Sequence, residues 1–228
     1  MPVVLVDRGF DQFGLDSVIL DNHNAARLAI RHLVGYGHKR IAMIGGPLTL
    51  STGAQRLAGY RETLIEAGVR YDPRWVRDAG FREQPAYDAA RELLALKDRP
   101  TAMFAANNLI AIGIMRAITD AGLRCPEDVS VVSIDDFAWA NAFRPRLTTV
   151  AQPVVEMGQA VVRLLLSRLD GRAPQTARTE VMAPRLIVRD SSCAPLRIRA
   201  AGAKTSANVP SAPPRTRART ARPGLSRS

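Results

Sequence analysis

The chain has 228 residues and carries 32 lysines and arginines against 21 acidic residues, a net charge of +11. Its 46% hydrophobic content is that of an ordinary globular protein, and a chain of this length can enclose a sizeable core. No run of 18 apolar residues is present, which excludes a membrane-spanning helix, and two cysteines are too few for a disulfide framework or a zinc site. The first residues lack the basic region of a secretory signal, so we expect a cytoplasmic protein.

The positive charge is concentrated at the C-terminus. Residues 196–228 contain eight basic residues and no acidic one, which leaves 24 basic and 21 acidic residues in 1–195. This tail also lacks aromatic residues and any hydrophobic period, and that composition predicts a disordered segment. An arginine-rich tail can bind nucleic acid phosphates without regard to sequence, but it can equally be an extension with no role.

Short apolar runs alternate along the chain with stretches of helical periodicity. The runs that predict buried strands are residues 3–6, 17–20, 41–44, 101–105 and 130–134, followed by two last short strands near Val181 and at 186–188. Helices are expected from Asp21 or Asn22 to Gly37, from about Leu57 to Gly68, over 85–96, from Asn107 to Gly122, and over 154–169. Strands that alternate with helices of this length indicate an α/β protein built on parallel sheets.

Familiar catalytic and metal-binding motifs are missing from the sequence. Gly45-Gly46-Pro47 follows a strand but lacks the glycine spacing of a dinucleotide-binding loop, and there is no phosphate-binding P-loop. The three histidines have no metal-ligand spacing, and His38 is expected only to cap a helix after Gly37. Asp135 and Asp136 leave a strand in different directions, so they do not form an acid–base pair. We therefore expect no enzyme, no metal and no cofactor.

Polar side chains follow the ends of several predicted strands. They are Asp7, Ser51, Thr52, Arg56, Asn107 and Asp135, with Phe81 after a further short apolar stretch. Since ligands of open α/β sheets bind outside the carboxyl ends of the strands, these residues are expected to converge on one crevice. Carboxylates, an amide and a guanidinium bind the hydroxyl groups of neutral polyols, sugars or nucleosides. Simpler interpretations are Asn107 as a helix N-cap, Arg56 as a surface ion-pair partner and Phe81 as a core aromatic.

Longer segments of the chain resemble one protein family. The resemblance is carried, in the family's order, by DNHNAARLAIRHLVGYGHKRIAMIGGP, STGAQRLAGYRETLIEAGV, RPTAMFAANNLIAIGIMRAITDAGLRCPEDVSVVSIDD and RPRLTTVAQPVVEMG. These segments resemble the LacI/GalR transcription regulators over about residues 2–192. The resemblance implies a periplasmic-binding-protein-like type I fold, in which two α/β subdomains with parallel sheets hold a ligand between them. It also implies the effector-sensing core of a DNA-binding repressor, with a sugar-like or nucleoside-like effector.

The same resemblance assigns a ligand-binding set. Its members are Asp7, Thr52, Arg56, Phe81, Asn107, Asp135 and Gln152, of which Arg56 and Asp135 are expected to contribute most. The sequence departs from the family at Asn107-Asn108, where Asn-Asp is usual, and at Ser133, where glycine is usual. The first exchange removes a charge near the pocket or the dimer face, and the second crowds a strand end, so both bear on which ligand is bound.

The resemblance also divides the chain into subdomains. Residues 1–21 and 150–182 are assigned to an N-terminal subdomain, 22–149 to a C-terminal one, 183–195 to a final strand on the latter, and 196–228 to the disordered tail. The N-terminal subdomain is expected to be incomplete, because the family's helix-turn-helix headpiece and first βα units have no counterpart here. Operator DNA would then be bound only through a headpiece that this sequence lacks, and intact relatives are implied to be homodimers.

Two other classes of protein stay open as alternatives. A sugar-binding protein of a transport system would share the fold but would carry a secretory signal. A small α/β enzyme would need a nucleophile–base pair or a metal constellation, and neither is found in the sequence.

Overall fold

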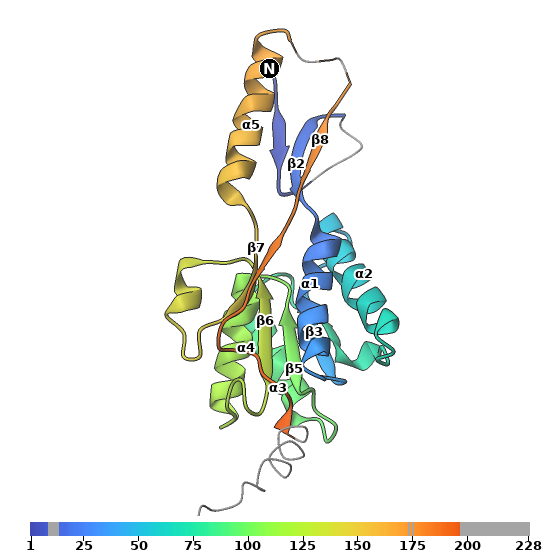
Figure 1. Ribbon diagram of the computed structural model, residues 1–228, viewed down its shortest axis with the longest axis vertical. Coiled ribbons are helices and arrows are strands. Elements are labelled where there is room, and N and C mark those ends of the chain that lie inside the picture. The colour runs from blue at the N-terminus through green and yellow to red at the C-terminus, as the bar shows by residue number, and fades with distance from the viewer. Residues whose placement is uncertain (9–13, 173, 175, 197–228) are drawn as a thin grey trace, which may run out of the picture.

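The computed structural model describes residues 1–8, 14–172, 174 and 176–196, which form two lobes stacked along the long axis of the molecule (Figure 1). The larger lobe is built on a six-stranded sheet with the order β4-β3-β5-β6-β7-β9, and the smaller on a three-stranded sheet with the order β1-β2-β8. The α/β class expected from the sequence is confirmed. Almost all of the basic tail expected to be disordered, residues 197–228, lies outside the described residues.

Five parallel strands and one antiparallel strand make up the sheet of the larger lobe. They are β3 (Ile41–Gly45), β4 (Val76–Asp78), β5 (Ala102–Ala105), β6 (Ser130–Ile134), β7 (Thr148–Ala151) and β9 (Arg185–Ile187). Only β9 runs antiparallel, against β7, so the sheet is parallel except at this edge. Strand β4 was not predicted, because three residues that are half-buried or exposed leave no apolar run in the sequence.

Two helix pairs cover this sheet. They are α1 (Asn22–Gly35) with α2 (Ser51–Glu66), and α3 (Glu83–Ala95) with α4 (Asn108–Asp120), on opposite sides of the sheet as right-handed crossovers require (Figure 1). Two short 3₁₀ turns, Pro73–Trp75 and Ala138–Asn141, lie in the connections. The predicted caps are confirmed: the Asp21 carboxylate accepts from the Asn24 N–H at 2.9 Å, and Asn107 Oδ1 accepts from the Ile110 N–H at 2.9 Å.

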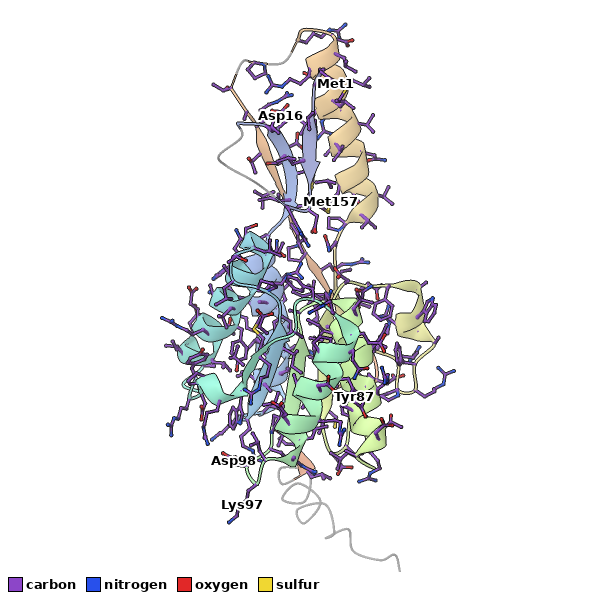
Figure 2. The ribbon with its side chains drawn as sticks, turned by 180° about the vertical axis from the view of Figure 1, so that it is seen from behind. Met1, Asp16, Tyr87, Lys97, Asp98 and Met157 are labelled. Carbon is purple, nitrogen blue, oxygen red and sulfur yellow. The ribbon has the colours of Figure 1, made fainter. Side chains whose placement is uncertain are left out.

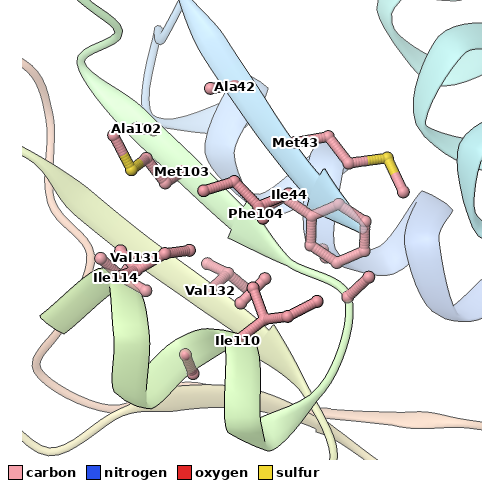
Figure 3. Close-up of a cluster of buried hydrophobic side chains, with 14 of the residues drawn as sticks. Ala42, Met43, Ile44, Ala102, Met103, Phe104, Ile110, Ile114, Val131 and Val132 are labelled. Carbon is pink, nitrogen blue, oxygen red and sulfur yellow. The ribbon is translucent and has the colours of Figure 1, made fainter. Parts of the chain in front are cut away.

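The hydrophobic core of the larger lobe lies between the sheet and these helices. Figure 3 shows side chains of neighbouring strands, including Met43, Phe104 and Val132, in one cluster with Ile110 and Ile114 of α4. All five are at most 2% exposed. The apolar runs at 41–44, 101–105 and 130–134 are therefore the central strands of the core, whereas the run at 3–6, also expected to be buried, forms the partly exposed strand β1 at the edge of the smaller sheet.

The smaller lobe contains fewer strands and helices than the larger one. Strands β1 (Val4–Val6), β2 (Asp16–Leu20) and β8 (Thr179–Met182) pair in parallel, and helix α5 (Val154–Leu169) packs along one flank. Its buried hydrophobic cluster consists of Val18 with Met157, Ala160 and Leu164. A sheet of three short strands with one helix buries little apolar surface, so other interactions must fix this lobe.

One such interaction is a buried ion triad around Asp16. The side chain of Asp16 is fully buried and accepts from Arg168 of α5 at 2.7 and 2.9 Å and from Arg178 at 2.8 Å. The backbone N–H of Arg178 also donates to it at 2.8 Å. The hydrogen bonds from Arg168 and Arg178 hold the pKa of Asp16 well below its usual range, against the opposing effect of burial. This triad ties β2, α5 and the segment before β8 together.

The chain passes between the two lobes three times. It crosses at Asp21 between β2 and α1, at residues 152–153 between β7 and α5, and at residues 183–184 between β8 and β9. The crossings lie together in the waist of the molecule (Figure 1). Strand β7 ends at one of these crossings, so the carboxyl ends of the parallel strands of the larger lobe face the waist.

His38 caps the end of α1 as predicted, since its backbone N–H donates to the Leu33 carbonyl at 3.2 Å, and its side chain is buried as well. Its Nε2–H donates to the carbonyl of Cys193 at 2.8 Å, its Nδ1 shares a hydrogen bond of 2.9 Å with Thr101 Oγ1, and only 1% of the residue is exposed. Burial, which outweighs the bond to Cys193, lowers the pKa of His38 to about 4. The segment that reaches Cys193 runs beside β6, where Val131 donates its N–H to the Ser191 carbonyl at 2.7 Å.

Because the pKa of His38 is lowered on folding, we expect the protein to lose stability in mild acid. The unfolded chain protonates His38 near its ordinary pKa of 6.5, whereas the folded chain does so only near 4. The free energy of unfolding should therefore fall between pH 6.5 and 4, by up to about 3 kcal/mol, and then level off with respect to this group. Urea titrations at several pH values measure the decline. Replacement of His38 by glutamine should flatten it, and an unchanged slope would contradict the assignment.

No helix in the described part of the chain combines the length and hydrophobicity that a bilayer crossing requires. The same residues contain no group of three or more histidine, cysteine or acidic side chains placed to hold a metal ion.

Candidate ligand-binding site

Three residues at strand ends of this fold adopt an unusual backbone conformation. Asp7, Phe81 and Asp135 follow β1, β4 and β6, and they are the three non-glycine residues with positive φ in the described structure, at 66°, 56° and 75°. A positive φ is uncommon for a residue with a side chain, and such strained positions concentrate at functional sites. All three belong to the ligand-binding set predicted from the sequence.

Arg56 lies at the centre of the predicted set. It stands in the second turn of α2 and is 4% exposed, so it is not the surface ion-pair partner of the simpler interpretation. Its Nε donates to Asn22 Oδ1 at 2.7 Å, and its Nη1 donates to the carbonyl of Ala106. The guanidinium also lies over the Phe81 ring, with Cζ 5.7 Å from the ring centroid. Phe81 therefore contacts the cluster itself as well as the core.

The charge of Arg56 is balanced by carboxylates. Burial lowers the pKa of Arg56, while the charges of Asp135 and then Asp7 raise it. Guanidinium groups keep their proton throughout the accessible pH range, so the side chain stays cationic. The surroundings of Arg56 thus contain two half-buried carboxylates and a second guanidinium, that of the exposed Arg8, whose charge lowers the pKa of Arg56.

Asp135 and Asp136 have separate partners, as their positions at the end of a strand predict. Asp135 Oδ1 accepts from Gln152 Nε2 at 2.5 Å, and its backbone N–H donates to Val150. Asp136 instead accepts from Thr149 Oγ1 and from Arg189 Nη1, both at 2.8 Å. Only Asp135 belongs to the cluster around Arg56, and Gln152, on a crossing segment, orients its carboxylate.

Asp7, in the smaller lobe, has a carboxylate oxygen whose hydrogen-bonding capacity is unsatisfied. Its Oδ1 is buried and has no hydrogen-bond partner among the residues that the structure describes. Burying a carboxylate oxygen without a donor costs free energy, typically about 1–3 kcal/mol. Such an atom beside Arg56 and Asp135 is the arrangement expected of a group that awaits a donor from a ligand.

Asn107 positions other residues of the site. Its Oδ1 caps α4, and its Nδ2 donates to the backbone carbonyl of Phe81 at 3.3 Å, so both ends of its amide are used. The Phe81 ring also lies so close to Gly46 that a Cβ there would come within 2.3 Å of it. The cap interpretation of Asn107 is therefore correct, and in addition this residue helps to hold Phe81 in its strained conformation.

Thr52 is the member of the predicted set that the structure links least to the others. It lies in the first turn of α2 and is 3% exposed, but no hydrogen bond joins it to the other six within the described ranges. Asn22, in contrast, was not predicted, although it accepts from Arg56. A buried arginine needs hydrogen-bond acceptors, and this requirement is the one indication that a residue such as Asn22 belongs to the site. The sequence alone does not say which residue supplies those acceptors.

Comparisons with known proteins identify the family to which this fold belongs. The family model for the periplasmic binding protein-like domain matches residues 30–192, which is most of the chain. This chain belongs to that family. Its relatives include the HTH-type transcriptional repressor PurR of Mannheimia succiniciproducens, 35% identical over 191 residues. That match covers 84% of this periplasmic binding protein-like chain but only 57% of the repressor, so the chain spans little more than half of its relative's length.

Solved structures place the chain among LacI-type regulators. The transcriptional regulator CelR in complex with cellobiose superimposes with a TM-score of 0.79 at 36% identity, covering 84% of this chain and 59% of that one. A LacI family regulator from Enterococcus faecium with bound ribose gives a TM-score of 0.77 at 28% identity, covering 85% of this chain and 71% of that one. The resemblance stated from the sequence is confirmed. These relatives are described as regulators, and neither as transport proteins nor as enzymes.

Proposed function

We propose that this chain is the effector-sensing core of a LacI-type transcriptional repressor, and that it binds a neutral, polyhydroxylated molecule between its two lobes. The effector is sugar-like or nucleoside-like. The observation that carries the proposal is the cluster of Asp7, Arg56 and Asp135, in which a buried carboxylate oxygen lacks a donor. Bound cellobiose and ribose in two structural neighbours support a polyol as the ligand class.

The charges of the cluster favour an uncharged ligand. Hydroxyl groups can donate to the unpaired oxygen of Asp7 and to Asp135, while the Nη2 group of Arg56, which donates to nothing in the described residues, can bond a ligand oxygen. A phosphate or carboxylate on the ligand would face the two carboxylates as well as the guanidinium groups of Arg56, already partly used, and of the exposed Arg8. Phe81 offers the face of its ring to a sugar or a base.

The three crossings connect binding to regulation. A ligand held by Asp7 in one lobe and by Arg56 and Asp135 in the other favours one relative arrangement of the lobes, because its affinity differs between arrangements. In the whole regulator, a cytoplasmic homodimer in this proposal, that shift would change the affinity of a separate headpiece for operator DNA. An enzyme and a transport protein fit the relatives less well.

The proposal is tested by calorimetric titration of the purified chain with matched neutral and phosphorylated ligands. Ribose with ribose 5-phosphate, cellobiose, and adenosine with its monophosphate make a suitable panel. We expect saturable binding of at least one neutral compound, and weaker or no binding of its phosphorylated partner. If no neutral polyol or nucleoside binds, the proposed function fails. Tighter binding of a phosphorylated compound would refute the charge argument alone.

Substitution of Asp7 by asparagine gives a sharper prediction. The change keeps the shape of the side chain but replaces one acceptor by a donor, so affinity for the neutral ligand should fall by about 1.5–3 kcal/mol, or roughly 10- to 100-fold. The matched control is Asp136→Asn, because Asp136 is bonded to Thr149 and Arg189 away from the cluster. Equal losses in the two variants, measured by the same titration, would contradict the assignment of Asp7.

A further inference from the structure

The end of the larger lobe that lies away from the smaller lobe carries an excess of positive charge. Figure 2 shows Lys97 and Asp98 at this end, far from Met1 and Asp16 in the smaller lobe. Five segments that lead into the parallel strands and one at the end of the described chain lie here; they are 36–40, 67–75, 96–101, 121–129, 145–147 and 190–196. They contain eight basic and five acidic residues, whereas the other residues of 1–196 contain 16 of each. The rest of the two lobes is therefore neutral, and the net charge is local.

Most acidic side chains at this end are already paired, but several basic ones are not. The ion pairs are Asp72 and Asp98 with Arg74, Asp128 with Arg124, and Asp190 with Arg146. Among the described residues, by contrast, the side chains of Lys39 and Arg99 have no hydrogen-bond or ion-pair partner. Arg40 uses only its Nε, which donates to the carbonyl of Arg99 at 2.9 Å. The remaining donors of these three residues are available to an anion from outside.

A hollow of about 510 Å³ lies between these basic side chains. It is lined by the three basic residues, by two acidic ones and by the last residue that the structure describes, namely Lys39, Arg40, Arg99, Glu127, Asp128 and Leu196. Since the charge of Asp128 is offset by Arg124, three cations face the single remaining carboxylate of Glu127. The chain also leaves the folded lobe at this hollow, so the segment after Leu196 starts from a positively charged surface.

The rest of the sequence adds to the same charge. Residues 197–228 contain seven arginines and one lysine, with no acidic and no aromatic residue. Like charges repel, so the electrostatics oppose binding of this tail in the hollow from which it starts. The hollow and the tail instead attract the same kind of partner, which is a polyanion.

The composition of the tail favours nucleic acid among polyanions. Arginine, which outnumbers lysine here by seven to one, has a planar fork of donors that matches the oxygens of a phosphate. An anchor in a lipid surface would need large apolar side chains, and the tail has only Ile198, Val209 and Leu225. A segment of 32 residues reaches at most about 110 Å, so charges spread along it suit a long linear anion better than a small one.

We propose that this end of the larger lobe, together with residues 197–228, binds the phosphate backbone of nucleic acid without regard to base sequence. Lys39, Arg40 and Arg99 provide contacts at fixed positions, and the arginines of the tail extend them along the backbone. The surface lies at the amino ends of the strands, whereas Arg56 and Asp135 lie beyond the carboxyl ends. The proposal therefore does not depend on the proposed function, and it requires no headpiece.

The proposal is tested on the full chain by fluorescence anisotropy with short labelled DNA duplexes of two unrelated sequences. We expect both duplexes to bind with the same affinity at low salt. The logarithm of the affinity should fall linearly with the logarithm of the salt concentration, because bound phosphates release their counterions. If six or more phosphates are contacted, the loss between about 50 and 200 mM salt should be about 10³-fold or greater.

Two double variants locate the surface. Lys39→Gln with Arg99→Gln removes two charges from the hollow, and Arg217→Gln with Arg219→Gln removes two from the tail. Each pair should reduce the salt slope by about 1–2, because one lost phosphate contact reduces it by about 1. Neither side chain in the hollow is bonded to the described residues, so the folded lobe should keep its stability.

The matched control is Arg61→Gln with Arg172→Gln, which removes two exposed arginines from other parts of the molecule and gives the same net charge. Its salt slope should equal that of the parent chain. Absence of binding at low salt, a preference for one of the two sequences, or an equal loss of slope in the control would overturn the proposal. So would a slope that the hollow variant leaves unchanged, or tighter binding to phosphatidylserine vesicles or polyglutamate than to DNA at the same salt concentration.

Discussion

Replacement of Arg56 by alanine is expected to abolish ligand binding and to destabilise the larger lobe by roughly 3–5 kcal/mol, the range for removing one partner of a buried ionic group. The substitution removes the donors to Asn22 Oδ1 and to the Ala106 carbonyl and leaves both acceptors buried. It also leaves Asp7 and Asp135 without the positive charge between them. Urea unfolding measures the stability, and calorimetric titration measures the binding.

Two comparisons isolate the role of the buried charge at Arg56. Arg61→Ala removes an exposed arginine from the same helix and should change stability by less than about 0.5 kcal/mol. Arg56→Ala combined with Asp135→Asn should recover part of the lost stability, because one of the unbalanced carboxylates is then neutral. If the double variant is as unstable as the sum of the two single variants, the carboxylates do not interact with Arg56 as the structure indicates.

Replacement of Asp16 by asparagine is expected to loosen the smaller lobe and to leave the larger one ordered. The fully buried carboxylate accepts from Arg168 and Arg178, so its neutralisation weakens both ion pairs and lowers the stability of this lobe. Hydrogen exchange should become faster in β1, β2 and α5 and stay slow in β3, β5 and β6. The control is Asp170→Asn, an exposed aspartate at the end of α5. Uniform acceleration across both sheets would contradict the prediction.

The same triad has a defined dependence on pH. Since the pKa of Asp16 is lowered on folding, the carboxylate stabilises the folded state fully above the ordinary value of 3.8. The contribution is lost as the pH falls below that value and through the lower pKa of the folded state. Protection of β2 should therefore decrease in strong acid in the parent chain, whereas in Asp16→Asn this part of the pH dependence should be absent.

Local patterns in the sequence predict much of this fold. The runs at residues 41–44, 101–105 and 130–134 become the buried strands of the larger lobe, because a continuous apolar run is what a strand covered on both faces requires. The helix N-cap at Asp21 could likewise be predicted from the sequence, since capping involves residues only a few positions apart. Polar residues directly after the strands, such as Asp135, could be placed at the site by topology alone.

Contacts between distant residues could not be predicted in this way. Asp16 meets Arg168 and Arg178 across 152 and 162 residues, and nothing near Asp16 in the sequence marks it as a buried anion. The strained conformation of Phe81 depends on the bond from Asn107 to its carbonyl, again between separate elements. The site was therefore recognisable by its residue types and its family resemblance, but the bonding that holds Arg56 in place was visible only in three dimensions.

The three crossings between the lobes limit how the molecule can move. Each is only one or two residues long, and they run through the same waist (Figure 1). Two rigid bodies joined by one tether keep several degrees of freedom, whereas three short tethers prevent separation and sliding and leave mainly a rotation about an axis through the waist. Because Asp135 is bonded to Gln152 on one tether, and Asp7 to Val18 of the strand that leads into another, a small displacement at the cluster is magnified with distance along each lobe. The far ends of the molecule, more than the ligand site itself, would then show the largest change in position.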